Sequence, residues 1–124
     1  MSLDAERTIL GAILLDNAAF DECSDMQESD WALDSHRTLI RTMGKMIRGG
    51  TQVDHVTLSN TLESDGQLSS IGNRAYLFSL TENLPRRLAV KNYAEIVLEK
   101  SKLRQLMLLG QEIGLRAADG SERA

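Results

Sequence analysis

The segment Leu103-Arg104-Gln105-Leu106-Met107-Leu108-Leu109-Gly110-Gln111-Glu112-Ile113-Gly114-Leu115 decides how this chain can fold. It lies within a proline-free stretch, from about Leu88 to Ala118, that predicts one long helix. Its apolar residues cover more than one face of that helix, which is typical of a helix that is buried on more than one side. The chain has no further segment with which to cover this surface, so we predict a contact with another chain or with a helix of a longer protein. The predicted contact residues are Leu103, Leu106, Met107, Leu109, Gly110, Ile113 and Gly114.

The two halves of the long predicted helix differ. Its first half carries one apolar stripe, which we expect to dock on the preceding helices: Val90, Tyr93, Ile96 and Val97. In its second half, Gly110 and Gly114 would let another helix come close. We therefore divide the chain into a helical globular part at residues 1–87 and a long helix with its end at residues 88–124.

The globular part shows helical periodicity from its first residues onward. The first predicted helix is capped by Asp4 and runs to about Leu15, with Gly11 placed where another helix comes close. Its buried stripe is Ile9, Leu10, Ile13 and Leu14. Further helices are predicted at about 18–23, 35–48, 55–64 and 70–83, and the one at 55–64 has an apolar stripe at Val56, Leu58 and Leu62. Asp54 is the predicted cap at the start of the helix at 55–64, and Gly49-Gly50 and Gly66 are predicted helix ends.

Composition bounds the remaining possibilities. With 124 residues, 42% of them hydrophobic and 26% charged, the chain fits one globular domain. One proline, 4% aromatic residues and no sustained period-two alternation predict an all-α fold, a compact multi-helix bundle followed by one long helix. A single cysteine, Cys23, cannot form an internal disulfide and suits a cytoplasmic protein. The start of the chain does not resemble a signal peptide, and its longest apolar run is too short to cross a bilayer.

Charge is unevenly distributed along the chain. The net charge is −4, and residues 16–34 hold seven acidic side chains and no basic one. Residues 86–104 hold six basic side chains against Glu95 and Glu99. The overall acidity argues against a main role in binding phosphate backbones. We interpret the acidic stretch as solvated loops and the basic stretch as a solvated helix face, and for the basic stretch a contact with nucleic acid or an acidic partner stays open as the alternative.

Sequence motifs for catalysis and for metal or nucleotide binding are absent or incomplete. A phosphate-binding loop fails at Gly44-Lys45, because Leu39 and Met46 stand where a glycine and a Ser or Thr are required. The spacing of His36, His55 and Cys23 matches no zinc pattern. We interpret His36 as a structural hydrogen-bonding residue, Cys23 as a small buried residue and Trp31 as part of the core. The acidic stretch lacks the glycine and closing glutamate of a calcium loop. The chain is therefore predicted to have no catalytic residue and to bind no cofactor or metal.

A series of short phrases in fixed order resembles a known family. They are Ala5-Glu6-Arg7-Thr8-Ile9-Leu10-Gly11, Leu14-Leu15-Asp16-Asn17, His36-Arg37-Thr38-Leu39-Ile40, Asp54-His55-Val56-Thr57-Leu58, Gly66-Gln67-Leu68, Tyr76-Leu77, Pro85 and Tyr93-Ala94-Glu95-Ile96-Val97. In this order and spacing they resemble the N-terminal domain of DnaB-type bacterial replicative DNA helicases. The chain departs from the family at Gly72-Asn73, where many members have two glycines, and at Arg86-Arg87, where small residues are commoner.

The resemblance implies both a fold and a function. In the family a helical bundle precedes a hairpin of two long helices, so the long helix here would be the first arm, with its tip at Asp119-Gly120-Ser121 and its second arm missing. The family's hairpins pair between subunits, and six domains form a collar that receives primase and in some systems a loader. The implied function is ring assembly and primase recruitment. ATP, magnesium, helicase activity and the contact with DNA would belong to a missing motor domain.

A second interpretation comes from another class of protein. Several short helices with glycine-containing turns also fit a small helix-turn-helix DNA-binding protein. The acidic balance and the absence of a basic recognition helix count against this alternative.

Overall fold

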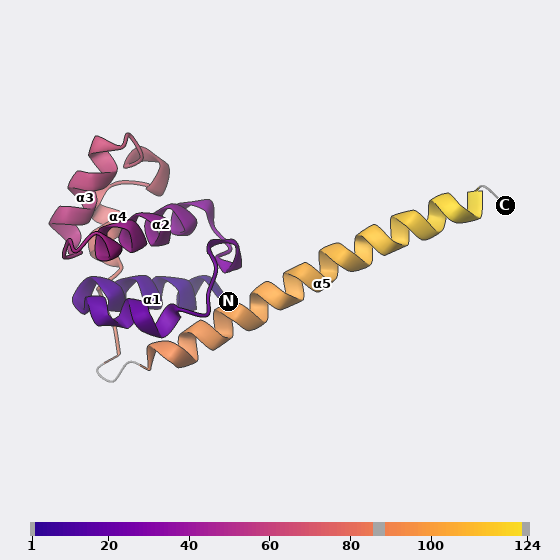
Figure 1. The fold of residues 1–124 in the computed structure, drawn as a ribbon, viewed down its shortest axis with the longest axis horizontal. Helices are drawn as coiled ribbons and strands as arrows, with labels where there is room; N and C mark the ends of the chain where they lie inside the picture. Colours follow the sequence, from indigo (N-terminus) through magenta and orange to yellow (C-terminus); the bar gives the residue numbers. More distant parts are fainter. Residues whose placement is uncertain (1, 86–88, 123–124) are drawn as a thin grey trace.

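The computed structural model describes residues 2–85 and 89–122 and shows five α-helices and three short 3-10 helices in these ranges. These are α1 (Ser2–Leu15), η1 (Asn17–Cys23), η2 (Glu28–Asp30), α2 (Asp34–Arg48), α3 (His55–Ser64), η3 (Ser69–Ile71), α4 (Arg74–Ser79) and α5 (Val90–Glu122). No strand occurs in the described residues, which confirms the predicted all-α class. In Figure 1 the short helices form one body, and α5 runs along it and then far beyond it.

The core of the body is built around α1. Its predicted stripe is buried, since Ile9, Leu10 and Ile13 have no exposed surface and Leu14 has little. The other large, fully buried apolar side chains come from the remaining segments of the body: Trp31, Leu39, Met43, Val53, Leu58, Leu62 and Leu77. The first part of α5 packs along α1, η1 and η2. One core therefore joins the body to the base of the long helix.

Gly11 permits the close approach that its position in the stripe predicted. A Cβ atom added there would lie 2.0 Å from the carbonyl oxygen of Leu80. The neighbour is the backbone that follows α4, rather than the side of another helix. Only glycine allows the backbones to come so close.

The predicted cap at the start of α3 and the predicted ends of α2 and α3 are confirmed, whereas α2 begins after Leu33 without a side-chain cap. The Asp54 side chain accepts a hydrogen bond from the Thr57 backbone N–H at 2.9 Å, and the Thr57 hydroxyl accepts from the Asp54 N–H at the same distance in return. The Thr57 hydroxyl also donates to the Gln52 carbonyl oxygen at 3.0 Å. The bond from the Thr57 backbone N–H to the carboxylate holds the pKa of Asp54 below its ordinary value. Gly50 and Gly66 follow α2 and α3 with φ of 82° and 70°, in the left-handed region that ends helices.

Three predicted boundaries were wrong. Asp4 lies inside the first turn of α1 rather than at its cap, where its charge still suits the positive end of the helix dipole. The single helix predicted at 70–83 is divided into η3 and α4, because Gly72 adopts φ of 114° and Asn73 caps a new helix by accepting from the Tyr76 N–H. The turn expected at Asp119-Gly120-Ser121 does not form, since α5 continues through Glu122. Each residue added to an existing helix gains one backbone hydrogen bond, which can offset the roughly 1 kcal/mol penalty of a glycine.

Two predicted core positions were also wrong. Val56 is 61% exposed and Ile96 is 42% exposed. Val56 cannot share a helix face with Leu58, since residues two apart point to different sides. Ile96 adjoins the fully buried Val97 and is likewise turned away from the body. Leu88, Arg86 and Arg87 lie outside the described residues.

Candidate partner surface on α5

The outer half of α5 carries a stripe of exposed apolar side chains. Leu103, Leu106, Met107, Leu109 and Ile113 are between 48% and 66% exposed. A Cβ atom added at Gly110 or Gly114 would meet nothing within 4 Å. The seven residues predicted as a contact surface thus lie together on one open side of the helix, which we call the outer stripe. Their use as an interface stays a prediction.

The outer half has a second apolar face, formed by Leu108 and Leu115. These side chains are 66% and 71% exposed. At about 100° per residue, both point away from the centre of the outer stripe. They follow Ser101 at intervals of seven residues, nearly two helical turns, and so continue the side of α5 that packs on the body. The body simply does not extend far enough to cover them (Figure 1).

The inner half of α5 is attached to the body by a regularly spaced row. Val90, Ala94, Val97 and Ser101 are all at most 4% exposed. Val90 and Val97 confirm the predicted docking stripe, whereas Ala94 and Ser101 were missed. The intervals of four, three and four residues could have revealed both, since this spacing keeps one helix face in contact.

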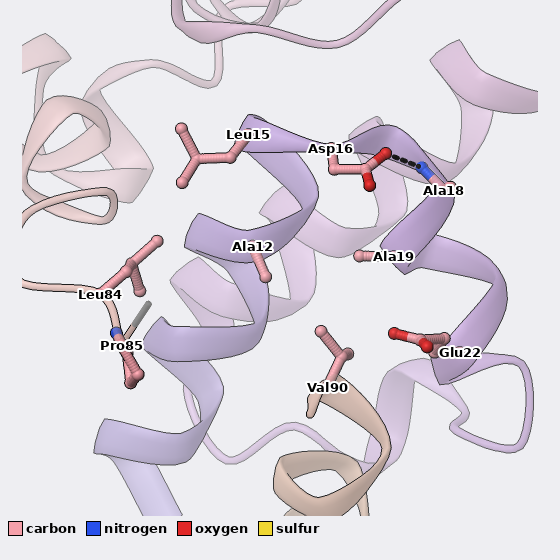
Figure 2. Close-up of a pocket in the computed structure, with 9 residues that line it drawn as sticks. All are labelled: Ala12, Leu15, Asp16, Ala18, Ala19, Glu22, Leu84, Pro85 and Val90. Atoms are coloured by element: carbon pink, nitrogen blue, oxygen red, sulfur yellow. Dashed lines mark hydrogen bonds between the residues drawn. The ribbon is translucent and has the colours of Figure 1, made fainter. Parts of the chain in front are cut away.

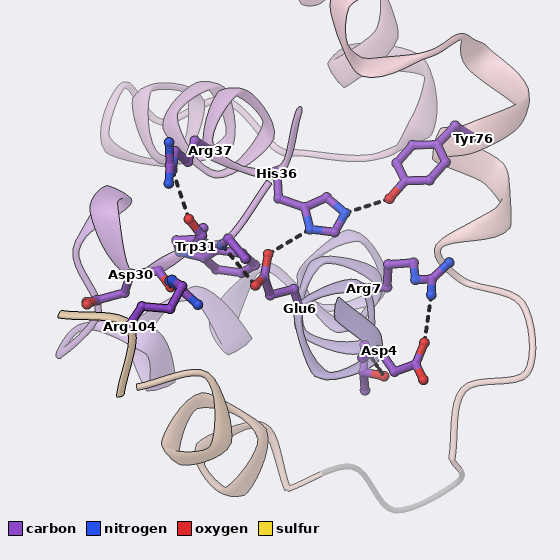
Figure 3. Close-up of polar contacts among 11 residues, drawn as sticks. Asp4, Glu6, Arg7, Asp30, Trp31, His36, Arg37, Tyr76 and Arg104 are labelled. Carbon is purple, nitrogen blue, oxygen red and sulfur yellow. Dashed lines mark hydrogen bonds and ion pairs between the residues drawn. The ribbon is translucent and has the colours of Figure 1, made fainter. Parts of the chain in front are cut away.

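The row ends at a polar contact with Asp30. The Ser101 hydroxyl donates to Asp30 Oδ1 at 2.7 Å, and the Arg104 guanidinium donates to the Asp30 carbonyl oxygen at 2.8 Å. Both Ser101 and Asp30 are buried. Figure 3 shows Arg104 reaching toward Asp30 from the α5 side. Beyond this contact, no described side chain of α5 is buried.

A buried polar network inside the body connects α1, α2 and α4. His36 Nδ1 is 2.8 Å from Glu6 Oε1, and its Nε2 is 2.6 Å from the Tyr76 hydroxyl (Figure 3). Because an ionised carboxylate only accepts, Nδ1 donates to Glu6, and in the neutral form of the ring Nε2 then accepts from Tyr76. Glu6 also accepts from the Ala32 N–H at 3.0 Å. His36 is therefore the structural hydrogen-bonding residue that we predicted, and its two side-chain partners were not found from the sequence.

The other candidate site residues do not form a site together. Cys23 is buried, and burial raises the pKa of its thiol to about 11, against the activation of a nucleophile. His55 stacks on Phe78 with ring centroids 4.6 Å apart, in a different part of the body from His36. Trp31 is in the core, as predicted. Within residues 2–85 and 89–122, no three His, Cys, Asp or Glu side chains are arranged to hold a metal ion.

The charged stretches are partly used for structure. In the acidic stretch, Asp16 accepts from the Ala18 N–H and caps η1, while Glu28 pairs with Arg41. In the basic stretch, Lys91, Lys100 and Lys102 are exposed on α5. None of the helices in the described ranges is both long and apolar enough to cross a membrane.

A cavity of about 400 Å³ opens where α1, η1 and the start of α5 meet. Figure 2 shows its mixed lining, with Leu15, Leu84 and Val90 around it and the carboxylates of Asp16 and Glu22 at one side. The Asp16 carboxylate is engaged in the cap of η1. The described lining thus offers a hollow but no pair of groups set for proton transfer or nucleophilic attack.

Comparison with known proteins relates most of the chain to one family. The model of the DnaB-like helicase N terminal domain matches residues 1–99. The replicative DNA helicase DnaB of Buchnera aphidicola subsp. Baizongia pistaciae is 38% identical over 90% of this chain, and that of Geobacillus stearothermophilus is 36% identical over 98%. These matches cover 24% and 26% of the two relatives, so the chain spans about a quarter of their length.

Two solved structures share the fold. The N-terminal domain of DnaB helicase from Mycobacterium tuberculosis matches with a TM-score of 0.89 and 28% identity, over 94% of this chain and 85% of that one. A DnaB-like replicative helicase, described together with its interactions with primase, matches with a TM-score of 0.78 and 23% identity. That match covers 93% of this chain and 27% of the other, and shows the fold alone.

Proposed function

The chain belongs to the family of DnaB-like helicase N-terminal domains, and from this premise we propose that it is the assembly and docking domain of a replicative DNA helicase. In this role it joins subunits into a ring and recruits primase at the replication fork. Helicase activity, with its ATP and magnesium, then belongs to a motor domain outside this chain. The relatives, of which this chain spans about a quarter, are replicative DNA helicases.

The observation that carries the assembly role is the outer stripe. Burying one leucine side chain contributes about 1.5–3 kcal/mol, so the several solvent-exposed leucines of the outer stripe strongly favour a state in which another helix buries them. A second copy of the same chain presents the same stripe and can bury it mutually, as in a two-fold symmetric pair. Gly110 and Gly114 leave open space at the centre of the stripe, which lets a second helix approach closely.

The second apolar face supports a helical hairpin. A single neighbouring helix can cover only one side of α5. Leu108 and Leu115 lie on the side away from the outer stripe and therefore need a second neighbour. We assign this side to the second arm of a hairpin and the outer stripe to another subunit. The primase role is supported by the neighbour whose interactions with primase are described.

Molar mass in solution tests the assembly role. Light scattering over a concentration series should give a dimer or a higher even-numbered assembly for the unaltered chain. Leu106→Asp or Leu109→Asp should weaken self-association at least about tenfold, because the loss of one buried leucine and the burial of a charge each exceed the 1.4 kcal/mol that a factor of ten represents. Circular dichroism should show nearly unchanged helix content.

Val56→Asp is the matched control for these variants. Val56 on α3 is 61% exposed and Leu106 is 63% exposed, so both variants place a carboxylate on a similarly open apolar site. The control should assemble like the unaltered chain. A monomer at every concentration, or full assembly of Leu106→Asp, would contradict the proposed stripe contact. Titration with primase from the same organism tests the second role, and absence of binding to the assembled domain would refute it.

A further inference from the structure

The place where α5 leaves the body is held by one buried residue. Asp30 uses three acceptor atoms: Oδ1 for Ser101, the carbonyl oxygen for Arg104, and Oδ2 for the Gln27 N–H at 2.7 Å. The first two bonds reach α5 and the third ties Asp30 to its own segment. Ser101 is the last buried residue of α5 among those described. The outermost attachment of the arm is therefore polar rather than apolar.

The segment at residues 27–32 is itself fastened to the body on several sides. The Ala32 N–H donates to Glu6 on α1, and Arg37 on α2 donates to the Trp31 carbonyl oxygen at 2.8 Å. The Trp31 ring is 1% exposed. Glu28 pairs with Arg41 on α2, and this bond lowers the pKa of Glu28. The segment thus links α1, α2 and α5 at one point.

Small movements at this point become large at the far end of the arm. Ser101 and Leu115 are 14 residues apart, which corresponds to about 21 Å along a helix. A pivot of about 10° at Ser101 would displace Leu115 by about 4 Å, close to the width of a side-chain contact. Hydrogen bonds can be exchanged for water at less cost than a packed apolar contact, so this attachment suits a hinge.

We infer that Asp30 fixes the direction in which α5 leaves the body, and that residues 27–32 are the joint through which the body orients the arm. Ser101 and Arg104 are positioning residues on the arm side of this joint. The inference concerns a single copy of the chain and does not depend on self-association. Releasing the two bonds from α5 lets the helix pivot beyond Val97 while the body keeps its fold.

Pulsed electron–electron double resonance on the spin-labelled chain tests this inference. Labels at Asn60→Cys on α3 and Gln111→Cys on α5, both exposed positions, report the direction of the arm in a Cys23→Ala background. Dilution with unlabelled chain restricts the signal to distances within one copy. The otherwise unaltered chain should give one narrow distance distribution, and Ser101→Ala with Arg104→Ala should broaden it at least twofold.

Two controls separate a pivot from other effects. Lys100→Ala with Lys102→Ala makes the same kind of change at exposed positions of the same turns and should leave the distribution narrow. A label pair within the body, at Asp21→Cys and Asn60→Cys, should stay narrow in every variant and would reveal unfolding. A broad arm distribution in the chain with Ser101 and Arg104 intact, or a narrow one in the double variant, would overturn the inference.

Discussion

Replacing Gly11 by alanine is the sharpest test of how the body is packed. In an open helix this substitution stabilises by about 1 kcal/mol, because alanine has the better helix propensity. At Gly11 we expect the opposite sign. The added Cβ atom would lie 2.0 Å from the Leu80 carbonyl oxygen and 2.9 Å from its carbonyl carbon.

The magnitude follows from what must move. The contact with the oxygen is 1.4 Å shorter than the 3.4 Å at which ordinary contacts begin, and the obstacle is backbone rather than the end of a flexible side chain. Overpacking of a core by one carbon costs about 1–3 kcal/mol, or more where the backbone shifts. Because the obstacle is backbone, we take the upper end of this range, and after the gain of about 1 kcal/mol in helix propensity we expect a net loss of about 2 kcal/mol in the free energy of unfolding.

Chemical denaturation followed by circular dichroism measures this loss. The unfolding midpoint should fall while the m-value stays the same. Gly110→Ala is the matched control, since the same Cβ there meets nothing within 4 Å and α5 should gain helicity rather than lose it. A Gly11→Ala chain as stable as the original would refute the close approach of α1 and the backbone at Leu80.

Three further outcomes test separate parts of the structure. Gly66→Val should destabilise the fold by about 1–2 kcal/mol in a thermal melt, because φ is 70°, whereas Gly66→Asn should be tolerated; an unchanged melting temperature for the valine variant would contradict the left-handed end of α3. Tyr76→Phe should cost about 1–3 kcal/mol in denaturant unfolding, since it leaves the fully buried His36 Nε2 without its donor, and equal stability would show that the bond is dispensable. Cys23 should react with a thiol reagent at pH 8 at least roughly a hundredfold slower in the folded chain than in denaturant, because its pKa is about 11 against an ordinary 9.0; similar rates would place the thiol at the surface.

The elements of the body could be predicted where the deciding forces are local. The stripe of α1, the cap at Asp54 and the helix ends at Gly50 and Gly66 depend on periodicity, on one side-chain hydrogen bond and on φ. Prediction failed where apolar periodicity favoured a continuous helix but the backbone conformation of one residue interrupted it. The helix expected at 70–83 gave way at Gly72, whose positive φ interrupts it before Asn73 starts α4.

Contacts between distant residues could not be predicted in the same way. Glu6 meets His36 across 30 positions of sequence, and Asp30 meets Ser101 across 71. Glu6 lies three residues before Ile9, so periodicity places it on the buried face, but its charge argues for solvent until a partner is known. The residues of the outer stripe could be predicted from the sequence alone. The joint at residues 27–32 that holds the helix could be recognised only from the fold.

The two halves of α5 follow different physical rules, and this difference shapes what the outer stripe can do. The inner half is held by a row of small contacts that ends at Ser101. The outer half has apolar residues on opposite sides, with Leu108 and Leu115 in line with the body-facing row. Covering one side alone leaves two leucines in water, each worth about 1.5–3 kcal/mol when buried. A second copy on the outer stripe therefore leaves Leu108 and Leu115 uncovered, and the arm needs a different neighbour on its body-facing side to be fully covered.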